Sequence, residues 1–195
     1  HTPGAVRAAF LHLAGDAAVS AAVGPPTFQA DRIFNSLAFI DPTGECAGYV
    51  VKNGLTPTEA TFFERGTRRA TLPLHGARIS AVICREIEDT AAVLEQLHPG
   101  QPDIVVWPGI MRPDPLGSGL GEPYIDSART LARALKAHVV QANWPNSLNY
   151  PAEGDQQGAS IVLSPDGESL LRLPRAQPGI GVFNLGDRQF DWHPE

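Results

Sequence analysis

Residues 76–86 read GARISAVICRE, and this stretch decides the fold because a strand ends within it and a helix begins. The apolar run at 77–83 predicts a strand. Residues 86–97 carry apolar side chains at helical spacing, and Gly100 follows as a stop signal, so they predict a helix. The nearly all-apolar run DIVVW at 103–107 is typical of a strand that is covered on both faces. Together these segments predict a strand–helix–strand unit.

Similar segments occupy the rest of the chain. They predict helices at 5–13 and 125–137, and strands at 17–23, 35–40, 45–51, 138–142, 158–163, 168–173 and 179–185. Residues 53–75 are expected to be an irregular connection, and 109–123 a loop rich in Gly and Pro. Because strand–helix–strand units mix with hairpins, we expect an α/β protein with a mixed sheet, outer helices and room for a second packed sheet.

The bulk composition is that of an ordinary globular chain. The 195 residues are 43% hydrophobic and 18% charged, which fits one domain over 1–195 and argues against disorder. The net charge is −6 and the basic residues are scattered, so no nucleic-acid surface is expected. No apolar run reaches the ~18 residues that a membrane-spanning helix needs. A charged and then apolar leader is absent from the start of the chain, so we do not expect secretion.

Cysteine and histidine usage narrows the function classes further. The two cysteines are too few for a disulfide framework, which favours a reducing compartment, and we expect a cytoplasmic protein. The six histidines show no paired ligand spacing, so no metal is expected. The sequence has neither a Gly-rich phosphate loop before a helix nor a Gly-x-Ser-x-Gly elbow, and we expect no cofactor.

Three residues have side chains suited to catalysis, and each also has an ordinary structural explanation. Cys84 lies where a strand gives way to a helix, whose free N–H groups and dipole favour the nucleophilic thiolate. From position alone, a small packing residue is the simpler interpretation, and Cys46 is interpreted as one. Lys52 ends a hairpin strand, where a surface charge is the usual case. Glu59 lies in a loop beside aromatic residues, and loop carboxylates are mostly solvated.

The order of these residues and their surroundings resembles the nitrilase superfamily of carbon–nitrogen hydrolases. The matching segments are NS at 35–36, DPTGE at 41–45, Tyr49 with Lys52 and Leu55, Glu59 with Phe63 and Gly66, GARISAVICRE at 76–86, DIVVWP at 103–108, AR at 128–129, VVQANW at 139–144 and GASIVLSPDGE at 158–168. Each segment is loose by itself, but the ordered set, which occurs without rearrangement, is specific.

The resemblance implies a four-layer α/β/β/α sandwich with mixed sheets and a Glu–Lys–Cys triad, often joined by a second Glu. Cys84 would attack the substrate carbon to form an acyl-enzyme, and Lys52 would stabilise the oxyanion. Glu59 would be the second glutamate, which positions Lys52 or the substrate. The backbone N–H of Arg85 would be a second oxyanion donor. Lys52 would also supply the cation that offsets the acidic residues at 86–89.

The resemblance also implies a pocket for a small-molecule amide or nitrile, with an amide favoured. It places Arg85, Pro108, Gly109 and Ile110 at this pocket. Trp107 and Trp144, each at a strand end, either line the pocket or cap the core. Many members carry an aromatic residue at the position of Arg85. Relatives commonly dimerise, so a homo-oligomer is implied as well.

One part of the family pattern is missing from these residues. The general-base Glu belongs to an early strand upstream of the helix at 5–13, so a strand–helix–strand unit of about 30 residues or more is expected to be absent. This absence favours a rival hypothesis, a binding or structural protein that kept the fold and lost catalysis. Retention of Lys52, Glu59 and Cys84 favours the enzyme. A third hypothesis is acyl transfer to an amine, which would require a membrane segment or acceptor domain that the sequence does not show.

Overall fold

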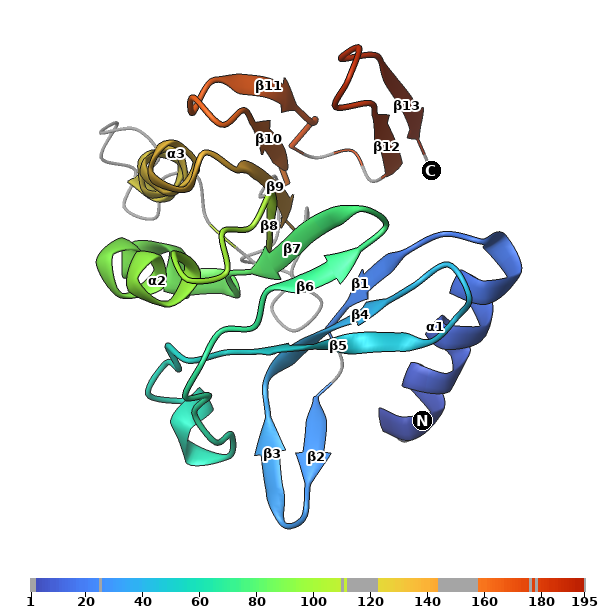
Figure 1. The fold of residues 1–195 in the computed structure, drawn as a ribbon, viewed down its shortest axis with the longest axis vertical. Coiled ribbons are helices and arrows are strands. Elements are labelled where there is room, and N and C mark those ends of the chain that lie inside the picture. Colours follow the sequence, from blue (N-terminus) through green and yellow to red (C-terminus); the bar gives the residue numbers. More distant parts are fainter. Residues whose placement is uncertain are drawn as a thin grey trace.

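The computed structural model describes residues 3–24, 26–109, 111, 123–143, 158–175, 177 and 179–194. Two main sheets pack face to face, with two helices outside the larger sheet and one outside the smaller (Figure 1). This is the layered α/β/β/α arrangement that the sequence predicted. No helix in these described ranges has both the length and the apolar character that crossing a membrane requires.

The larger sheet combines parallel and antiparallel pairing. Its strands are β6 (Leu72–Leu74), β7 (Ala77–Ala81), β8 (Ile104–Gly109), β9 (His138–Asn143), β10 (Ile161–Leu163) and β11 (Ser169–Arg172). They follow one another in space in this same order. The central strands β7, β8 and β9 are parallel, and the outer pairs are antiparallel. The crossovers between the parallel strands carry α2 (Thr90–Leu97) and α3 (Pro123–Leu135), because parallel neighbours cannot be joined by a tight hairpin.

The smaller sheet is antiparallel and carries the other outer helix. Its strands are β1 (Ala21–Val23), β4 (Ser36–Ile40) and β5 (Cys46–Val51), with β4 in the centre. All five residues of β4 are buried, since it is covered by the larger sheet on one face and by α1 (Pro3–Ala17) on the other (Figure 1).

Strand β8 shows how the two hydrophobic cores form. Its side chains alternate between faces, so Val105 and Trp107 pack with α2 and α3, while Val106 packs between the sheets. Val105 and Trp107 are both fully buried. Burying one such large side chain is worth about 1.5–3 kcal/mol. The prediction that this strand is covered on both faces is confirmed.

The predicted helix at 86–97 is wrong in its first turn. A 3-10 helix, η2, spans Cys84–Glu88, and α2 begins only at Thr90. Asp89 between them has φ −88° and ψ 47°, which is not helical. The Glu86 carboxylate accepts a hydrogen bond of 2.8 Å from the N–H of Ile83, and this local contact holds a tight turn where we expected a continuous helix.

Other differences arise where short elements carry no periodic signal. The expected irregular connection at 53–75 contains β6 and a 3-10 helix, η1 (Glu59–Thr61). Pro73 is tolerated in β6 because β6 is an edge strand. The expected strand at 17–23 begins only at Ala21, since α1 continues through Ala17. The unpredicted strands are β2 (Thr27–Gln29), β3 (Arg32–Phe34) and β13 (Phe190–Pro194).

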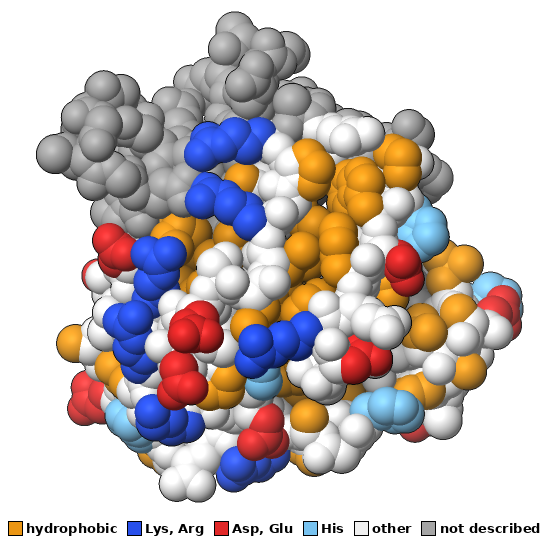
Figure 2. All heavy atoms as spheres, turned by 90° about the horizontal axis from the view of Figure 1, so that it is seen from above, with side chains coloured by type: hydrophobic (Ala, Val, Ile, Leu, Met, Phe, Trp, Pro, Cys, Tyr) orange, Lys and Arg blue, Asp and Glu red, His pale blue; other side chains and the backbone are white. Residues whose placement is uncertain are grey.

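A terminal hairpin lies at the top of Figure 1. It pairs β12 (Gly179–Phe183) with β13 and leaves Ile180, Val182 and Phe190 exposed. Figure 2, which views the molecule from above this end, shows hydrophobic side chains gathered among charged ones. The homo-oligomer and the cytoplasmic location implied by the sequence remain predictions.

Two glycines permit a matched test of the contact between the Asp41–Glu45 turn and α1. Gly44 and Gly76 both have positive φ, +82° and +84°, but only Gly44 faces the helix: a Cβ there would lie 2.6 Å from the Leu11 carbonyl oxygen. A Cβ on Gly76 would have no atom within 4 Å apart from those of its chain neighbours. Gly76→Ala should therefore cost only the backbone penalty of about 1–2 kcal/mol. Gly44→Ala should cost roughly 1–3 kcal/mol more, because it also overpacks the contact with the helix. Urea unfolding would measure both, and equal losses would contradict the close contact.

Candidate active site

Lys52 is not the surface charge that its sequence position suggested. It follows the last residue of β5, and its side chain is 1% exposed. The Nζ atom lies 2.7 Å from each carboxylate oxygen of Glu59. Because a buried ammonium without a partner would cost several kcal/mol, the ion pair with Glu59 is what offsets the burial of Lys52.

Glu59 is itself held by several donors. Its Oε1 accepts a hydrogen bond of 2.8 Å from Asn35 Nδ2, and its Oε2 accepts one of 2.8 Å from the N–H of Thr56. Burial alone would raise the pKa of Glu59, but hydrogen bonds from Lys52, Thr56 and Asn35 outweigh it, so the pKa is lowered. Glu59 is therefore ionised at neutral pH and suited to holding Lys52 in place.

Cys84 lies between the two hydrophobic cores and contacts both. Its φ is +56°, a left-handed conformation that costs a non-glycine residue about 1–2 kcal/mol. Strain of this kind gathers at functional sites, where the surroundings enforce it. Here strand β8 does so: the Trp107 indole N–H donates to the Cys84 carbonyl at 3.0 Å, and a Cβ on Gly109 would lie 2.9 Å from the Cys84 Cα.

A helix begins at Cys84 as the sequence predicted, but it is a 3-10 helix and not the expected α-helix. The residue opens a 3-10 helix of five residues, and α2 begins at Thr90, beyond that turn. That Lys52 supplies the cation facing the thiol, as the family resemblance implied, remains a prediction.

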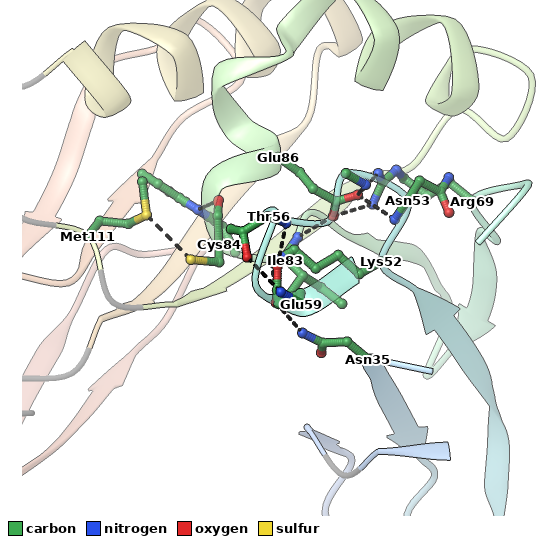
Figure 3. Close-up of polar contacts among 12 residues, drawn as sticks. Asn35, Lys52, Asn53, Thr56, Glu59, Arg69, Ile83, Cys84, Glu86 and Met111 are labelled. Atoms are coloured by element: carbon green, nitrogen blue, oxygen red, sulfur yellow. Dashed lines mark hydrogen bonds and ion pairs between the residues drawn. The ribbon is translucent and has the colours of Figure 1, made fainter. Parts of the chain in front are cut away.

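The Glu86 side chain connects the segment after Lys52 with the segment before Cys84. Its Oε1 accepts hydrogen bonds of 2.7 and 2.8 Å from the backbone N–H groups of Asn53 and Gly54. Its Oε2 accepts one of 2.8 Å from the N–H of Ile83. One buried carboxylate thus links the neighbour of Lys52 with the neighbour of Cys84. Figure 3 shows these residues gathered around the Lys52–Glu59 pair.

Arg69 is the counterion of Glu86. Its Nη2 lies 2.8 Å from Glu86 Oε1, and both side chains are at most 2% exposed. Its Nη1 donates to Glu86 Oε2 at 3.2 Å and to the Ala81 carbonyl at 2.6 Å. Burial would raise the pKa of Glu86, but Arg69 and the backbone donors outweigh it, so the pKa is lowered. The sequence indicated Glu86 as a charge that opposes the thiolate and as the last residue of the motif at 76–86, and no motif pointed to Arg69.

The residues predicted to line the pocket have different surroundings. The Arg85 guanidinium lies 3.8 Å from both Glu88 and Asp89, so those carboxylates already engage it. Pro108 and Gly109 end β8, and Gly109 lies against Cys84. Ile110 and Trp144 lie outside the described residues. Trp107 is fully buried, which favours the interpretation that it caps the core over the one that it lines the pocket.

Met111 and Asn143 also belong to this region, although the sequence gave Met111 no role. The Met111 Sδ lies 4.0 Å from the Cys84 Sγ. Asn143 fixes the Met111 backbone by accepting from its N–H at 2.8 Å and donating to its carbonyl at 2.9 Å. The described residues contain no group of three or more His, Cys, Asp or Glu side chains suited to a metal ion.

Comparisons with known proteins agree with the fold and with the family resemblance. A family model described as carbon-nitrogen hydrolase matches residues 1–185. An (R)-stereoselective amidase from a Pseudomonas species is 28% identical over 163 residues, which are 80% of this chain and 54% of that protein. This chain therefore spans about half the length of that curated relative.

Solved structures share the fold at low identity. A carbon-nitrogen hydrolase from Helicobacter pylori G27 matches with a TM-score of 0.75 and 16% identity, over 98% of this chain and 67% of that one. An amidase from Nesterenkonia sp. AN1, with acrylamide added at its active-site cysteine, matches with a TM-score of 0.71 and 19% identity, over 89% and 66%. The predicted nitrilase-type fold is confirmed.

The partly buried Lys52–Glu59 pair predicts how stability depends on pH. The folded pKa of Glu59 lies below its unfolded value near 4.5, so the unfolded state binds more protons as the pH falls. The stabilisation is fully present above that value and is lost as the pH drops through the folded pKa. The free energy of unfolding, measured by urea between pH 7 and 3.5, should fall more steeply for the parent than for the double variant Lys52→Met, Glu59→Gln. Parallel curves would contradict a lowered pKa.

Proposed function

Because the chain belongs to the carbon–nitrogen hydrolase family, we propose that it forms the catalytic core of a cysteine amidase. The observation that carries this proposal is the ion pair between the buried Lys52 and the partly buried Glu59, tied through Glu86 to the strained residue Cys84. The substrate class is a small-molecule amide, with a nitrile as the second candidate. The amidase activity of the Pseudomonas relative supports an amide.

In the proposed reaction the Cys84 thiolate attacks the carbonyl carbon of the amide and forms a carbon–sulfur bond. The carbonyl oxygen becomes an oxyanion, which the Lys52 ammonium stabilises. The tetrahedral intermediate then breaks its C–N bond, and the departing nitrogen leaves as ammonia or an amine with the proton that the general base took from the Cys84 thiol. Water attacks the resulting thioester, releases a carboxylic acid and restores the cysteine.

The Arg85 backbone N–H is the proposed second donor to the oxyanion. Trp107 supports this assignment through its hydrogen bond with the carbonyl of Cys84. The peptide bond that joins Cys84 to Arg85 is planar and trans, so its N–H points away from its C=O. With the carbonyl directed toward the buried indole, the N–H is directed away from the core.

The general base has to be a different carboxylate from Glu59. Both Glu59 oxygens bind Lys52, and the lowered pKa of Glu59 makes it a poor proton acceptor at neutral pH. We propose that residues outside 1–195 supply the base, as the family resemblance implies. The rival hypothesis, a non-catalytic binding protein, predicts an ordinary cysteine at position 84.

Thiol labelling separates the two hypotheses without a substrate. Iodoacetamide should modify Cys84 well before Cys46, because only Cys84 is proposed to be a thiolate held by Lys52. Lys52→Met should slow the labelling of Cys84 and leave that of Cys46 unchanged. Mass spectrometry of the two cysteine peptides gives both rates. Equal rates in the folded parent would remove Cys84 from the mechanism and favour the non-catalytic protein.

Turnover gives the second test, in a protein that includes the base. Cys84→Ser should abolish hydrolysis of small amides, since a serine hydroxyl is far harder to ionise than a thiol. Lys52→Met should lower kcat by ~10²-fold or more, because the oxyanion develops only during reaction. Circular dichroism should show both variants folded. Near-parental turnover by either variant would show that the assigned role is wrong.

A further inference from the structure

Glu86 takes no part in the reaction proposed above, yet its charged side chain is 2% exposed and lies between the segments that hold Lys52 and Cys84. We propose that Glu86, with Arg69 as its counterion, is a positioning residue that sets the Lys52 ammonium against the Cys84 sulfur. The inference rests on the proposed roles of Lys52 and Cys84 and extends them to a residue that bonds to neither side chain.

The two carboxylate oxygens serve two different segments. Oε1 accepts from Asn53 and Gly54, which follow Lys52, and Oε2 accepts from Ile83, which precedes Cys84. A carboxylate is rigid and planar, so neither segment can shift relative to the other without breaking one of these bonds. Shifts of about 1 Å at a catalytic group are enough to cost ~10²-fold in rate.

Lys52 has no freedom left at its backbone. Its N–H donates to the Asn35 carbonyl at 2.8 Å, and its carbonyl accepts from the N–H of Gly66 at 3.0 Å. A Cβ on Gly66 would lie 2.1 Å from Asn53 Oδ1, so the loop packs closely against the residue that Glu86 holds. A shift of the Asn53–Gly54 segment would therefore be passed to Lys52 through Gly66 as well as along the chain.

Energetics favours positioning over stability as the reason for this arrangement. In other proteins, replacing a buried ion pair by apolar residues is often neutral, or stabilising by roughly 1–4 kcal/mol. Arg69 also keeps a buried Nε–H without a partner among the described residues, which costs about 1–3 kcal/mol. A pair selected for stability alone would not leave this donor unsatisfied.

The first experiment uses Glu86→Asp in the 195-residue chain. This variant keeps the charge that Arg69 needs, but it is one methylene shorter and cannot reach both segments at once. The readout is the pH dependence of iodoacetamide labelling at Cys84. We expect the midpoint of the curve of Cys84 labelling rate against pH to move to higher pH in this variant. For each pH unit of this rise, labelling of Cys84 at pH 7 should slow by about tenfold, while Cys46 keeps its rate. An unchanged profile in a folded variant would overturn the proposal.

Asp103→Ala is the matched control. Asp103 also accepts from a backbone N–H and pairs with an arginine, Arg78, but it lies where β8 begins, away from the Cys84 end of the sheet. The control should lose stability without changing the labelling profile of Cys84. If it shifted the profile as Glu86→Asp does, the effect would follow general destabilisation, and the proposal would be wrong.

A second experiment exploits the cavity of about 650 Å³ that borders Glu86 and is also lined by Asn53, Gly54, Arg69 and Gln96. In Glu86→Ala, added formate should enter this space and accept hydrogen bonds from the N–H groups of Asn53, Gly54 and Ile83. This should restore fast labelling of Cys84. Formamide, which has the same shape without the charge, should not. Rescue by both or by neither would overturn the role of the carboxylate.

The parent protein separates this inference from the proposed function. If Cys84 in the parent labels no faster than Cys46, or if Lys52→Met has no effect, the proposed function fails and the positioning role fails with it. If both behave as expected while Glu86→Asp retains the parental profile, only the positioning role fails.

Discussion

One buried carboxylate, that of Glu86, joins the two sheets of the sandwich at the point where the candidate site lies. It binds the loop that leaves β5 of the smaller sheet and the turn that leaves β7 of the larger one, and Arg69 adds a bond to the last carbonyl of β7. Hydrophobic packing between the sheets is non-directional and tolerates small slides. Hydrogen bonds from fixed backbone groups do not, so this carboxylate converts a packed interface into a defined geometry.

Strand β8 acts on Cys84 from the other direction. Trp107 holds the carbonyl of Cys84 from within the helix-side core, and Gly109 leaves just enough room for its Cα. The left-handed backbone of Cys84 is therefore enforced by two residues of one strand. The sulfur itself is held more loosely, with the Met111 sulfur 4.0 Å away.

Much of the fold followed from the sequence because its long elements are periodic. The apolar run of β8 and the amphipathic spacing of α3 identified a layered α/β protein. The catalytic candidates were found through the order of their motifs, since Lys52 and Glu59 each look ordinary alone. Arg69 and the bond of Trp107 to Cys84 could not be found this way, because these partners lie 17 and 23 residues away and no local pattern marks such a contact. The break at Asp89 could not be predicted for a related reason. The Glu86 side chain accepts from the Ile83 N–H and stabilises a 3-10 turn, whereas the apolar spacing favoured a continuous α-helix.

Cys84 is packed against both hydrophobic cores, and this has a consequence for how such a protein can change over generations. Protein interiors are close-packed, so a methyl group added or removed in a core is felt by its neighbours. Val106 lies between the sheets, and Leu131 lies in α3 within the core under the helices. Each belongs to a core that packs against Cys84, so a substitution at either residue can reach the thiol through packed neighbours. Substitutions in either of the two cores can therefore shift the Cys84 sulfur by small steps during selection for a new substrate. No residue that contacts the substrate has to change.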